Sequence, residues 1–314
     1  MDKTAKIFVA GHRGMVGRAL VRALQAQGYT QLITRSRSEL DLLDQNAVLA
    51  FLQAQQPEYI FIAAAKVGGI QANHLYRADF IYQNLMIEAN LIHSAHVAGV
   101  QQLMFLGSSC IYPRDCPQPI RESYLLTGPL EPTNEPYAVA KIAGIKLCQA
   151  YNAQFGRQYL SVMPTNLYGP GDNDDLATSH VLPALLRKAH EARARGDTTL
   201  TVWGSGTPRR EFLYVDDLAQ ACLHLMQNPV DVAQHSLINV GTGVDVSIRE
   251  LAEQVMATVG FAGRIVFDAS KPDGTPRKLL DVSLLASLGW RASTPLDEGI
   301  VKAYASASYR AAAG

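Results

Sequence analysis

The amino-acid sequence predicts an α/β protein, built on a doubly wound parallel (Rossmann) sheet with a smaller, discontinuous α/β domain attached. Two observations support this fold class. Short apolar runs alternate with segments of helical periodicity, and the first run leads directly into three glycines spaced three residues apart. Strands that are apolar throughout and joined through helices form parallel sheets covered on both faces. Ligands of such sheets bind at the carboxyl ends of the strands.

The predicted elements alternate regularly through the first third of the chain. Strands are expected at residues 6–11, 31–35, 58–65 and 101–109. Helices are expected between them, at residues 15–28, 47–55 and 84–99. This order predicts successive strand-helix-strand units with parallel neighbours.

The sequence also predicts a division into two domains, because 314 residues can form two lobes around separate cores. Residues 1–165 are assigned to a cofactor-binding domain, which the chain enters again at about 211–240. Residues 166–210 and 241–290 are assigned to a substrate domain, and 291–314 to a C-terminal helix.

Composition excludes several classes of protein. The 28 basic and 28 acidic residues balance, so net charge offers no argument for nucleic acid or an anionic membrane as partner. No apolar stretch is long enough for a bilayer span or a signal peptide. The cysteines show neither CxxC pairs nor the spacing of metal ligands: Cys110, Cys116, Cys148 and Cys222. We therefore expect free thiols, no metal and a reducing, cytoplasmic location.

The stretch GHRGMVG carries Gly11, Gly14 and Gly17 at the first predicted strand-to-helix turn. Glycines there let the backbone turn tightly and approach a pyrophosphate, while the following helix directs its N-terminal N–H groups at the anion. On pattern alone, a structural turn without a nucleotide stays open as an alternative. The position of the turn favours a dinucleotide.

The end of the second predicted strand indicates which dinucleotide binds. Arg35 and Arg37 stand where an acidic residue would bind the ribose 2′-hydroxyl of NAD, and Arg13 lies in the glycine turn. Guanidinium groups suit a 2′-phosphate, so NADP(H) is the predicted cofactor, with a solvated basic loop as the alternative. Asp41 and Leu42 are expected to contact the adenine.

The stretch YAVAK places Tyr137 and Lys141 four residues apart, on one face of a helix. A lysine ammonium near a phenol favours the phenolate, so we expect a lowered tyrosine pKa and proton exchange with an alcohol or ketone. Ser108, at the end of the fourth predicted strand, would hold the substrate oxygen. A Y-x-x-x-K pair by itself also fits a plain surface helix.

Together, the glycine turn and the Ser/Tyr/Lys set resemble the extended short-chain dehydrogenase/reductase family. The stretch SSCIYP lacks the Asp-Glu pair with which sugar dehydratases of this family eliminate water, which disfavours dehydration. Cys110 offers instead a thiol that can remove a proton from carbon beside a ketone. Long blocks such as LEPTNEPYAVAKIAGIKLC and DASKPDGTPRKLLDV resemble, nearly end to end, the branch of epimerase-reductases that make GDP-L-fucose.

That resemblance implies a bifunctional reaction on GDP-4-keto-6-deoxy-D-mannose: epimerisation at C3 and C5, then hydride transfer from NADPH to C4. Tyr137 would protonate the C4 oxygen, Lys141 would lower the tyrosine pKa and bind the nicotinamide ribose, and Ser108 would bind the sugar oxygen. Cys110 would be the base of the epimerisation, and His180 the acid on the opposite face.

Further contacts are implied by the same resemblance. For the cofactor they involve the glycine turn, the ends of two strands and the following segments: His12, Met15, Val16, Leu106, Gly107, Ser109, Pro164, Thr165, Asn166, Leu167 and His180. For the GDP moiety they involve basic, aromatic and acidic residues of the substrate domain: Lys188, Trp203, Arg210 and Asp273. Family members commonly have arginine at the position of Lys188, and lysine keeps the charge without the bidentate geometry.

The resemblance also implies a homodimer, in which helices containing residues 80–99 and 137–155 pair as a four-helix bundle. Burial of these apolar faces against the sheet alone is the alternative. Two other functions stay open. One is a sister enzyme that makes a related GDP-deoxyhexose or only reduces C4. The other is a non-catalytic NADP-binding regulator, which the intact Ser108, Tyr137 and Lys141 disfavour.

Overall fold

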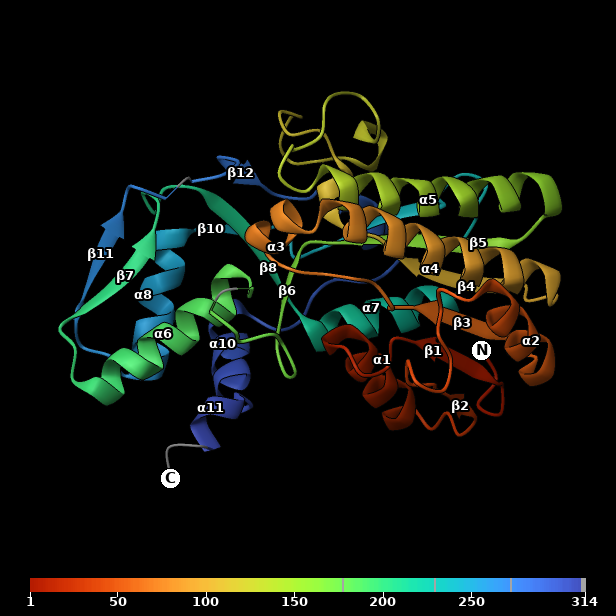
Figure 1. Ribbon diagram of the computed structural model, residues 1–314, viewed down its shortest axis with the longest axis horizontal. Helices are drawn as coiled ribbons and strands as arrows, with labels where there is room; N and C mark the ends of the chain where they lie inside the picture. The colour runs from red at the N-terminus through yellow and green to blue at the C-terminus, as the bar shows by residue number, and fades with distance from the viewer. Residues whose placement is uncertain (177, 229, 272, 312–314) are drawn as a thin grey trace.

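The computed structural model describes residues 1–176, 178–228, 230–271 and 273–311. Within these residues, six parallel strands form the central sheet in the order β2-β1-β3-β4-β5-β9 (Figure 1). The strands are β2 (Leu32–Ile33), β1 (Ile7–Ala10), β3 (Tyr59–Ile62), β4 (Gln102–Leu106), β5 (Gln158–Pro164) and β9 (Leu237–Val240). The order reverses between β1 and β3, and open sheets of this kind bind ligands at that point.

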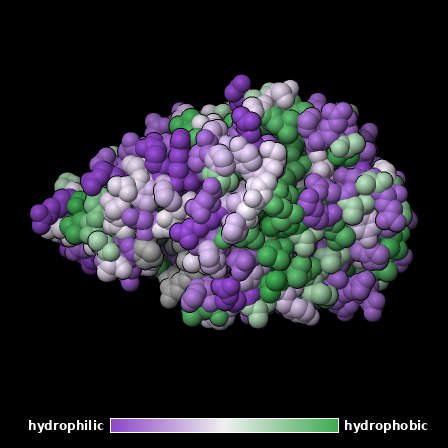
Figure 2. Space-filling view, turned by 90° about the horizontal axis from the view of Figure 1, so that it is seen from above, coloured by the Kyte–Doolittle hydropathy of each residue, from purple (hydrophilic) through white to green (hydrophobic). Residues whose placement is uncertain are grey.

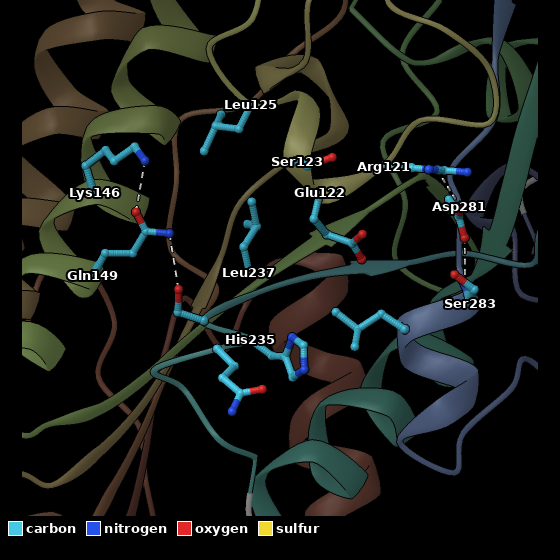
Figure 3. A pocket seen from close by; sticks show the side chains of 13 residues that line it. Arg121, Glu122, Ser123, Leu125, Lys146, Gln149, His235, Leu237, Asp281 and Ser283 are labelled. Carbon is cyan, nitrogen blue, oxygen red and sulfur yellow. Dashed lines mark hydrogen bonds and ion pairs between the residues drawn. The ribbon is translucent and has the colours of Figure 1, made fainter.

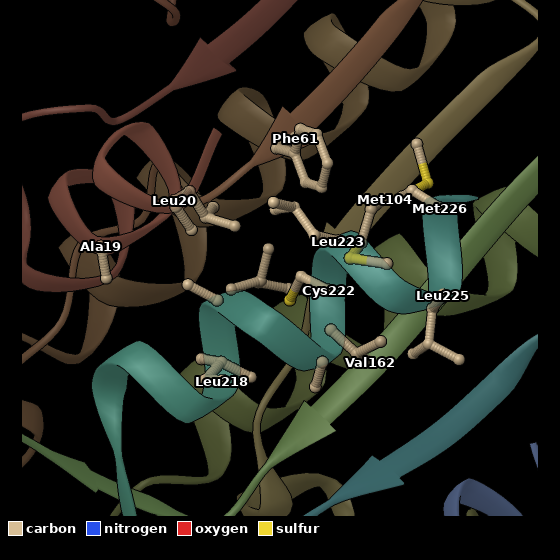
Figure 4. Packing of buried hydrophobic residues seen from close by; sticks show 14 of the residues in the cluster. Ala19, Leu20, Phe61, Met104, Val162, Leu218, Cys222, Leu223, Leu225 and Met226 are labelled. Atoms are coloured by element: carbon tan, nitrogen blue, oxygen red, sulfur yellow. The ribbon is translucent and has the colours of Figure 1, made fainter. Parts of the chain in front are cut away.

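Helices cover both faces of this sheet because the side chains of each strand point alternately to one face and the other. In β3, Phe61 packs under α1 (Met15–Ala26) and α7 (Val215–Gln227), whereas its neighbours Ile60 and Ile62 pack under α2 (Gln45–Gln55), α4 (Arg77–Val97) and α5 (Glu135–Phe155). Figure 4 shows the first of these cores, where Leu20 of α1, Phe61 and Leu223 of α7 come together.

A second lobe packs around its own apolar core. Its larger sheet runs β10-β8-β12, with β6 beside β8, and a smaller one pairs β7 with β11. The strands are β6 (Asn166–Tyr168), β7 (Thr199–Trp203), β8 (Arg209–Tyr214), β10 (Asp245–Ser247), β11 (Arg264–Asp268) and β12 (Arg277–Lys278). The helices of this lobe are α6 (Val181–Arg195), α8 (Ile248–Val259) and α10 (Leu296–Ala305). The remaining elements are short: α3 (Ile70–Leu75), η1 (Ser109–Ile111), η2 (Glu122–Tyr124), α9 (Ser283–Ser287) and α11 (Ser308–Ala311).

The structure differs from the sequence prediction at several places. Strand β8 belongs to the sheet of the second lobe, although residues from about 211 were assigned to the cofactor domain. Helix α4 begins at Arg77 rather than at residue 84. The predicted C-terminal helix 291–314 is instead two helices, α10 and α11, because Pro295 delays the start and α10 already ends at Ala305; residues 312–314 lie outside the described residues. Leu285 of α9 packs in the core on the sheet, although residues 241–290 were assigned to the substrate domain.

Glu211 of β8 connects the two lobes. Its side chain is fully buried, and one carboxylate oxygen accepts hydrogen bonds from the backbone N–H groups of Thr242 (2.6 Å) and Gly243 (2.7 Å). The other oxygen accepts from the N–H of Leu280 at 3.0 Å. Thr242 and Gly243 follow β9 of the central sheet, so this one carboxylate fixes β8 relative to the end of β9.

We expect Glu211→Ala to lower the free energy of unfolding by about 3 kcal/mol, because three backbone N–H groups, that of Leu280 fully buried, lose their acceptor. Chemical denaturation measures the effect. Glu253→Ala is the matched control, because Glu253 is an exposed glutamate on α8. A loss of similar size in both variants would contradict this role of Glu211.

Candidate active site

Two glycines shape the turn between β1 and α1. Gly11 has a φ of 85°, and a Cβ added to it would lie 2.6 Å from the backbone nitrogen of Ala64, which follows β3. A Cβ at Gly17 would collide with the carbonyl of Gly11. Helix α1 has 12 residues, starts after Gly14 without a side-chain cap and has no acidic residue in its first turn. Its unpaired N–H groups therefore suit a pyrophosphate, and a Cβ at Gly11 or Gly17 would disrupt the turn.

The predicted 2′-phosphate site lies beside this turn. Arg35 follows β2, and its guanidinium lies 5.2 Å from the ring centroid of Phe51. The pKa of the Glu39 carboxyl is lowered mainly by hydrogen bonds from Ser36, with smaller contributions from the charges of Arg35 and Arg13. The glycine turn and the end of β2 therefore each place an arginine near the same carboxylate. Such a pair suits an anion in this loop.

The other residues expected near the adenine lie in the same loop. Arg37 is exposed. Asp41 accepts a hydrogen bond from the N–H of Leu43 at 3.1 Å. Leu42 packs its side chain against the core, and its carbonyl accepts from the amide of Asn90 at 2.9 Å. The backbone around Leu42 is thereby held to α4.

The stretch after β4 presents the predicted serine and cysteine. Gly107 donates its N–H to the carbonyl of Val162 in β5 at 2.9 Å, which prolongs the sheet by one residue. Ser108 then precedes the short helix η1, and its hydroxyl accepts from the N–H of Cys110 at 3.4 Å. Ser109 and Cys110 are both buried. The turn thus places Ser108 and Cys110 next to each other at the carboxyl edge of the sheet.

Tyr137 and Lys141 lie in the first two turns of α5, which packs against η1 and β4. The Lys141 ammonium donates a hydrogen bond to the carbonyl of Leu106, the last residue of β4, at 3.0 Å. The structure therefore brings Ser108, Cys110, Tyr137 and Lys141 together around the end of one strand, as the motifs predicted.

One electrostatic expectation is not met. The sequence predicted that Lys141 lowers the pKa of Tyr137, but desolvation raises that pKa well above its usual value, and the charges of Cys110 and Glu88 raise it further. The Lys141 nitrogen, which was expected to lower this pKa, lies 5.8 Å from the phenol ring centroid and 2.9 Å from a carboxylate oxygen of Glu88. The phenol is therefore protonated at neutral pH.

Cys110 and His180 share one charged neighbour. Burial raises the pKa of the Cys110 thiol, and the charge of Lys278 in β12 is the largest opposing effect. His180 immediately precedes α6. Desolvation of its imidazole lowers its pKa, and Lys278 lowers it further. Lys278 thus acts electrostatically on both groups predicted to move protons on carbon, although the two come from different lobes.

The segment after β5 is held by backbone contacts to the second lobe. The hydroxyl of Thr165 and the amide of Asn166 both donate to the carbonyl of Glu211, at 3.2 and 2.8 Å. The remaining predicted cofactor residues are distributed along the same edge. They are His12 in the glycine turn, Met15 and Val16 in α1, Leu106 in β4, Pro164 in β5 and Leu167 in β6.

The four residues predicted for GDP form two contacts in the second lobe. The Lys188 ammonium lies 4.9 Å from the centroid of the half-exposed Trp203 ring. Desolvation lowers the pKa of the Arg210 guanidinium, and the nearby charge of Asp273 opposes this. Asp273 itself accepts from the N–H and hydroxyl of Ser205, at 2.6 and 2.8 Å, just after Trp203. Two cations, a flat aromatic surface and an acid are suited to a nucleoside diphosphate.

A separate pocket of about 680 Å³ lies beside β9. Figure 3 shows Glu122, Lys146 and His235 around it, with Arg121 paired to Asp281. None of the predicted site residues lines this pocket. They lie instead along the carboxyl edge of the central sheet and in the second lobe, which together form the candidate active site.

Sequence reasoning missed one charged residue of this site, Glu88, and grouped another, Lys278, with the basic residues near Asp273 that suit a diphosphate. Glu88 lies on the buried face of α4. In the sequence, the one feature that marks it is a carboxylate at a position where helical periodicity predicts burial. Lys278 directly follows Arg277, and nothing in the sequence distinguishes the two. Only the pairing of β12 with β8 brings Lys278 to Cys110.

Two findings are limited to the described residues. These residues hold no group of three or more His, Cys, Asp or Glu side chains arranged for a metal. In that same part of the chain, every helix is too short or too polar to cross a bilayer.

Comparison with known proteins adds independent information. Residues 7–241 match the model of the NAD dependent epimerase/dehydratase family. The chain is 58% identical over 305 residues to the GDP-L-fucose synthase of Escherichia coli (strain K12), covering 95% of both chains. Its structure is similar to a GDP-6-OMe-4-keto-L-xylo-heptose reductase from C. jejuni, with a TM-score of 0.91, 38% identity and 100% and 99% of the two chains covered. It is also similar to a GDP-L-fucose synthetase from Naegleria fowleri bound to NADP, with a TM-score of 0.88, 28% identity and 97% and 93% covered.

We expect Gly17→Ala to weaken NADPH binding at least about tenfold, because a distortion of 1.4 kcal/mol in the turn is sufficient. The added Cβ would collide with the Gly11 carbonyl. Gly14→Ala is the control for a methyl group added without a backbone collision, because the heavy atom nearest to its Cβ would be 3.5 Å away. Fluorescence titration measures affinity, and unchanged binding in Gly17→Ala would contradict the assignment of the turn.

Proposed function

Because the chain belongs to the NAD dependent epimerase/dehydratase family, we propose that it converts GDP-4-keto-6-deoxy-D-mannose to GDP-L-fucose, by epimerisation at C3 and C5 and reduction at C4. The observation that supports this most is the convergence of Ser108, Cys110, Tyr137 and Lys141 at the end of β4. Full-length similarity to the E. coli GDP-L-fucose synthase supports the substrate.

NADPH is the proposed cofactor and, when bound, supplies the hydride for C4. The residues of the glycine turn would bind its pyrophosphate, and Arg13, Arg35 and Arg37 its 2′-phosphate. The NADP-bound relative supports this choice. In the proposed division of the chain, the central sheet with α7 and β9 binds the cofactor, and the second lobe binds the GDP moiety through Lys188 and the residues around Trp203.

In the reduction, Tyr137 would donate its phenolic proton to the C4 oxygen as that oxygen gains negative charge. Its raised pKa supports this role, because the proton is present at neutral pH and is released only to a strongly basic oxygen. Ser108 would hold the same oxygen by a hydrogen bond, and Lys141 would hold the nicotinamide ribose.

In the epimerisation, the Cys110 thiolate would take the proton from C3 or C5, and the C–H electrons would move into an enolate with its charge on the C4 oxygen. His180 would return a proton to the opposite face of the same carbon, which inverts it. Burial raises the pKa of Cys110, and the charges of Lys278 and Lys141 partly restore the thiolate.

The surface of α4 and α5 supports a homodimer. Both helices bury apolar residues against the sheet, yet Tyr82, Val97, Val139 and Phe155 remain exposed on them. Figure 2 shows a hydrophobic band on the face seen from above, the side on which these two helices lie in Figure 1. Pairing with a second copy as a four-helix bundle would bury this surface, and sedimentation equilibrium tests it.

Four free cysteines and an NADPH-dependent reaction support a cytoplasmic location.

A second candidate function is reduction of a related GDP-keto-sugar without epimerisation. The structural similarity to the GDP-6-OMe-4-keto-L-xylo-heptose reductase favours it. Incubation with GDP-4-keto-6-deoxy-D-mannose and NADPH, followed by NMR identification of the hexose, separates the two. GDP-L-fucose as product supports the first candidate, and a hexose with the original C3 and C5 configuration supports the second.

We expect Tyr137→Phe to lower the rate of NADPH oxidation by a factor of about 10² to 10⁴, because the proton donor is lost. Exchange of deuterium from solvent into C3 or C5 should continue, since Cys110 and His180 are unchanged. NMR of the recovered nucleotide sugar measures this exchange. Parallel loss of exchange and reduction would contradict separate groups for the two steps.

The complementary variant is Cys110→Ser. It should reduce deuterium exchange by about 100-fold or more, because an alcohol is a far weaker acid than a thiol and supplies little anionic base. NADPH affinity should be unchanged. Cys222→Ser is the matched control, because Cys222 is equally buried but lies in the core on the other face of the sheet. Near-normal exchange in Cys110→Ser would exclude the thiol as base.

A further inference from the structure

A buried carboxylate lies behind the proposed active site. Glu88 projects from α4, and its residue is 1% exposed. One carboxylate oxygen lies 2.9 Å from the ammonium of Lys141, which is equally buried. That ammonium also donates to the carbonyl of Leu106 at 3.0 Å. The lysine nitrogen is therefore fixed between a helix on one side and the end of β4 on the other.

The surroundings of this pair are apolar and tightly packed. The Lys141 nitrogen lies 4.6 Å from the ring centroid of Phe105. Gly144 lies about one turn after Lys141 on α5. A Cβ added to Gly144 would lie 2.8 Å from the second carboxylate oxygen of Glu88 and 2.6 Å from the ring of Phe105. Only glycine leaves room for the carboxylate here. A buried ion pair of this kind adds little to stability compared with apolar residues of the same volume, so its placement needs another reason.

We propose that Glu88 is a positioning residue of the active site, which holds the Lys141 ammonium against the Leu106 carbonyl and so sets where Lys141 can meet the cofactor. The inference rests on the proposed roles of Tyr137 and Lys141. Without the carboxylate, the lysine side chain keeps a single neutral acceptor and gains freedom to move toward the phenol. The distance between ammonium and phenol would then no longer be fixed.

Burial raises the pKa of the Glu88 carboxyl, and the Lys141 ammonium opposes this rise. In its charged form, Glu88 has a second effect, on the proton donor. The charged groups that act on the Tyr137 phenol are Cys110 in η1 and Glu88 on α4. From its own helix, the Lys141 ammonium lies 5.8 Å from the ring centroid. After desolvation and Cys110, Glu88 raises the pKa of Tyr137. The carboxylate therefore helps to keep the phenol protonated, as a donor must be.

The test is Glu88→Gln, which preserves volume and removes the charge. We expect kcat for NADPH-dependent reduction to fall by about 100-fold, as for a reacting group displaced by about 1 Å. We also expect the KM for the nucleotide sugar to change little. A donor with a lower pKa loses its proton at lower pH, so the basic limb of the kcat profile should move to lower pH. A purely structural role would lower the amount of folded enzyme and leave the profile in place.

Two variants complete the experiment. Gly144→Ala keeps both charges but displaces the Glu88 carboxylate, so it should also lower kcat. This variant replaces Glu88→Gln as the test if Glu88→Gln does not fold. Glu298→Gln is the control, because it removes an exposed carboxylate paired with Lys302. Wild-type kcat and an unmoved profile in Glu88→Gln, or wild-type kcat in Gly144→Ala, overturns the inference.

A failure of the proposed function gives a different result. If Lys141→Met retains full reduction, the proposed role of Lys141 is wrong, whatever Glu88 does. If Lys141→Met loses reduction while both Glu88→Gln and Gly144→Ala behave as wild type, the proposed function stands and the inference about Glu88 is wrong.

Discussion

The buried carboxylate of Glu211 is the contact on which the arrangement of the two lobes depends. The carboxylate oxygens accept hydrogen bonds from the segment after β9 and from Leu280, which follows β12. The backbone carbonyl of Glu211 accepts from the side chains of Thr165 and Asn166, which follow β5. The strand that carries Glu211 also carries Arg210, one of the residues assigned to GDP. The same strand therefore links the cofactor sheet to the nucleotide-binding part of the second lobe.

Most of the fold follows from local patterns. The alternation of four-residue apolar runs with helical periods is sufficient for a parallel sheet, and the glycine turn, Ser108 and the Tyr137–Lys141 pair identify the functional edge of it. The same patterns did not predict that α4 begins at Arg77. They also could not show that the C-terminal segment forms two helices, since Ala-rich sequence favours helix throughout.

The charges of the site were less predictable than its motifs. A Y-x-x-x-K spacing places a lysine near a phenol, but the pKa of that phenol depends on what else the lysine contacts. Glu88 lies 53 residues before Lys141 in the chain, and only the packing of α4 against α5 brings them together. Burial of the phenol is the largest cause of its raised pKa, and neither burial nor long-range contacts of this kind leave a signal in local spacing, so the expected direction of the Tyr137 shift was wrong.

Two proton-transfer tasks with opposite requirements meet at the end of β4. The proposed epimerisation needs Cys110 deprotonated, whereas the proposed reduction needs Tyr137 protonated. Burial raises the pKa of both groups, so burial alone serves only the reduction. The structure separates them by the charges it places nearby. Lys278 and Lys141 favour the thiolate of Cys110, while Glu88, the ion-pair partner of Lys141, opposes ionisation of Tyr137. The two groups therefore lie side by side in different charge environments: nearby cations oppose the raised pKa of Cys110, and nearby negative charge adds to the raised pKa of Tyr137.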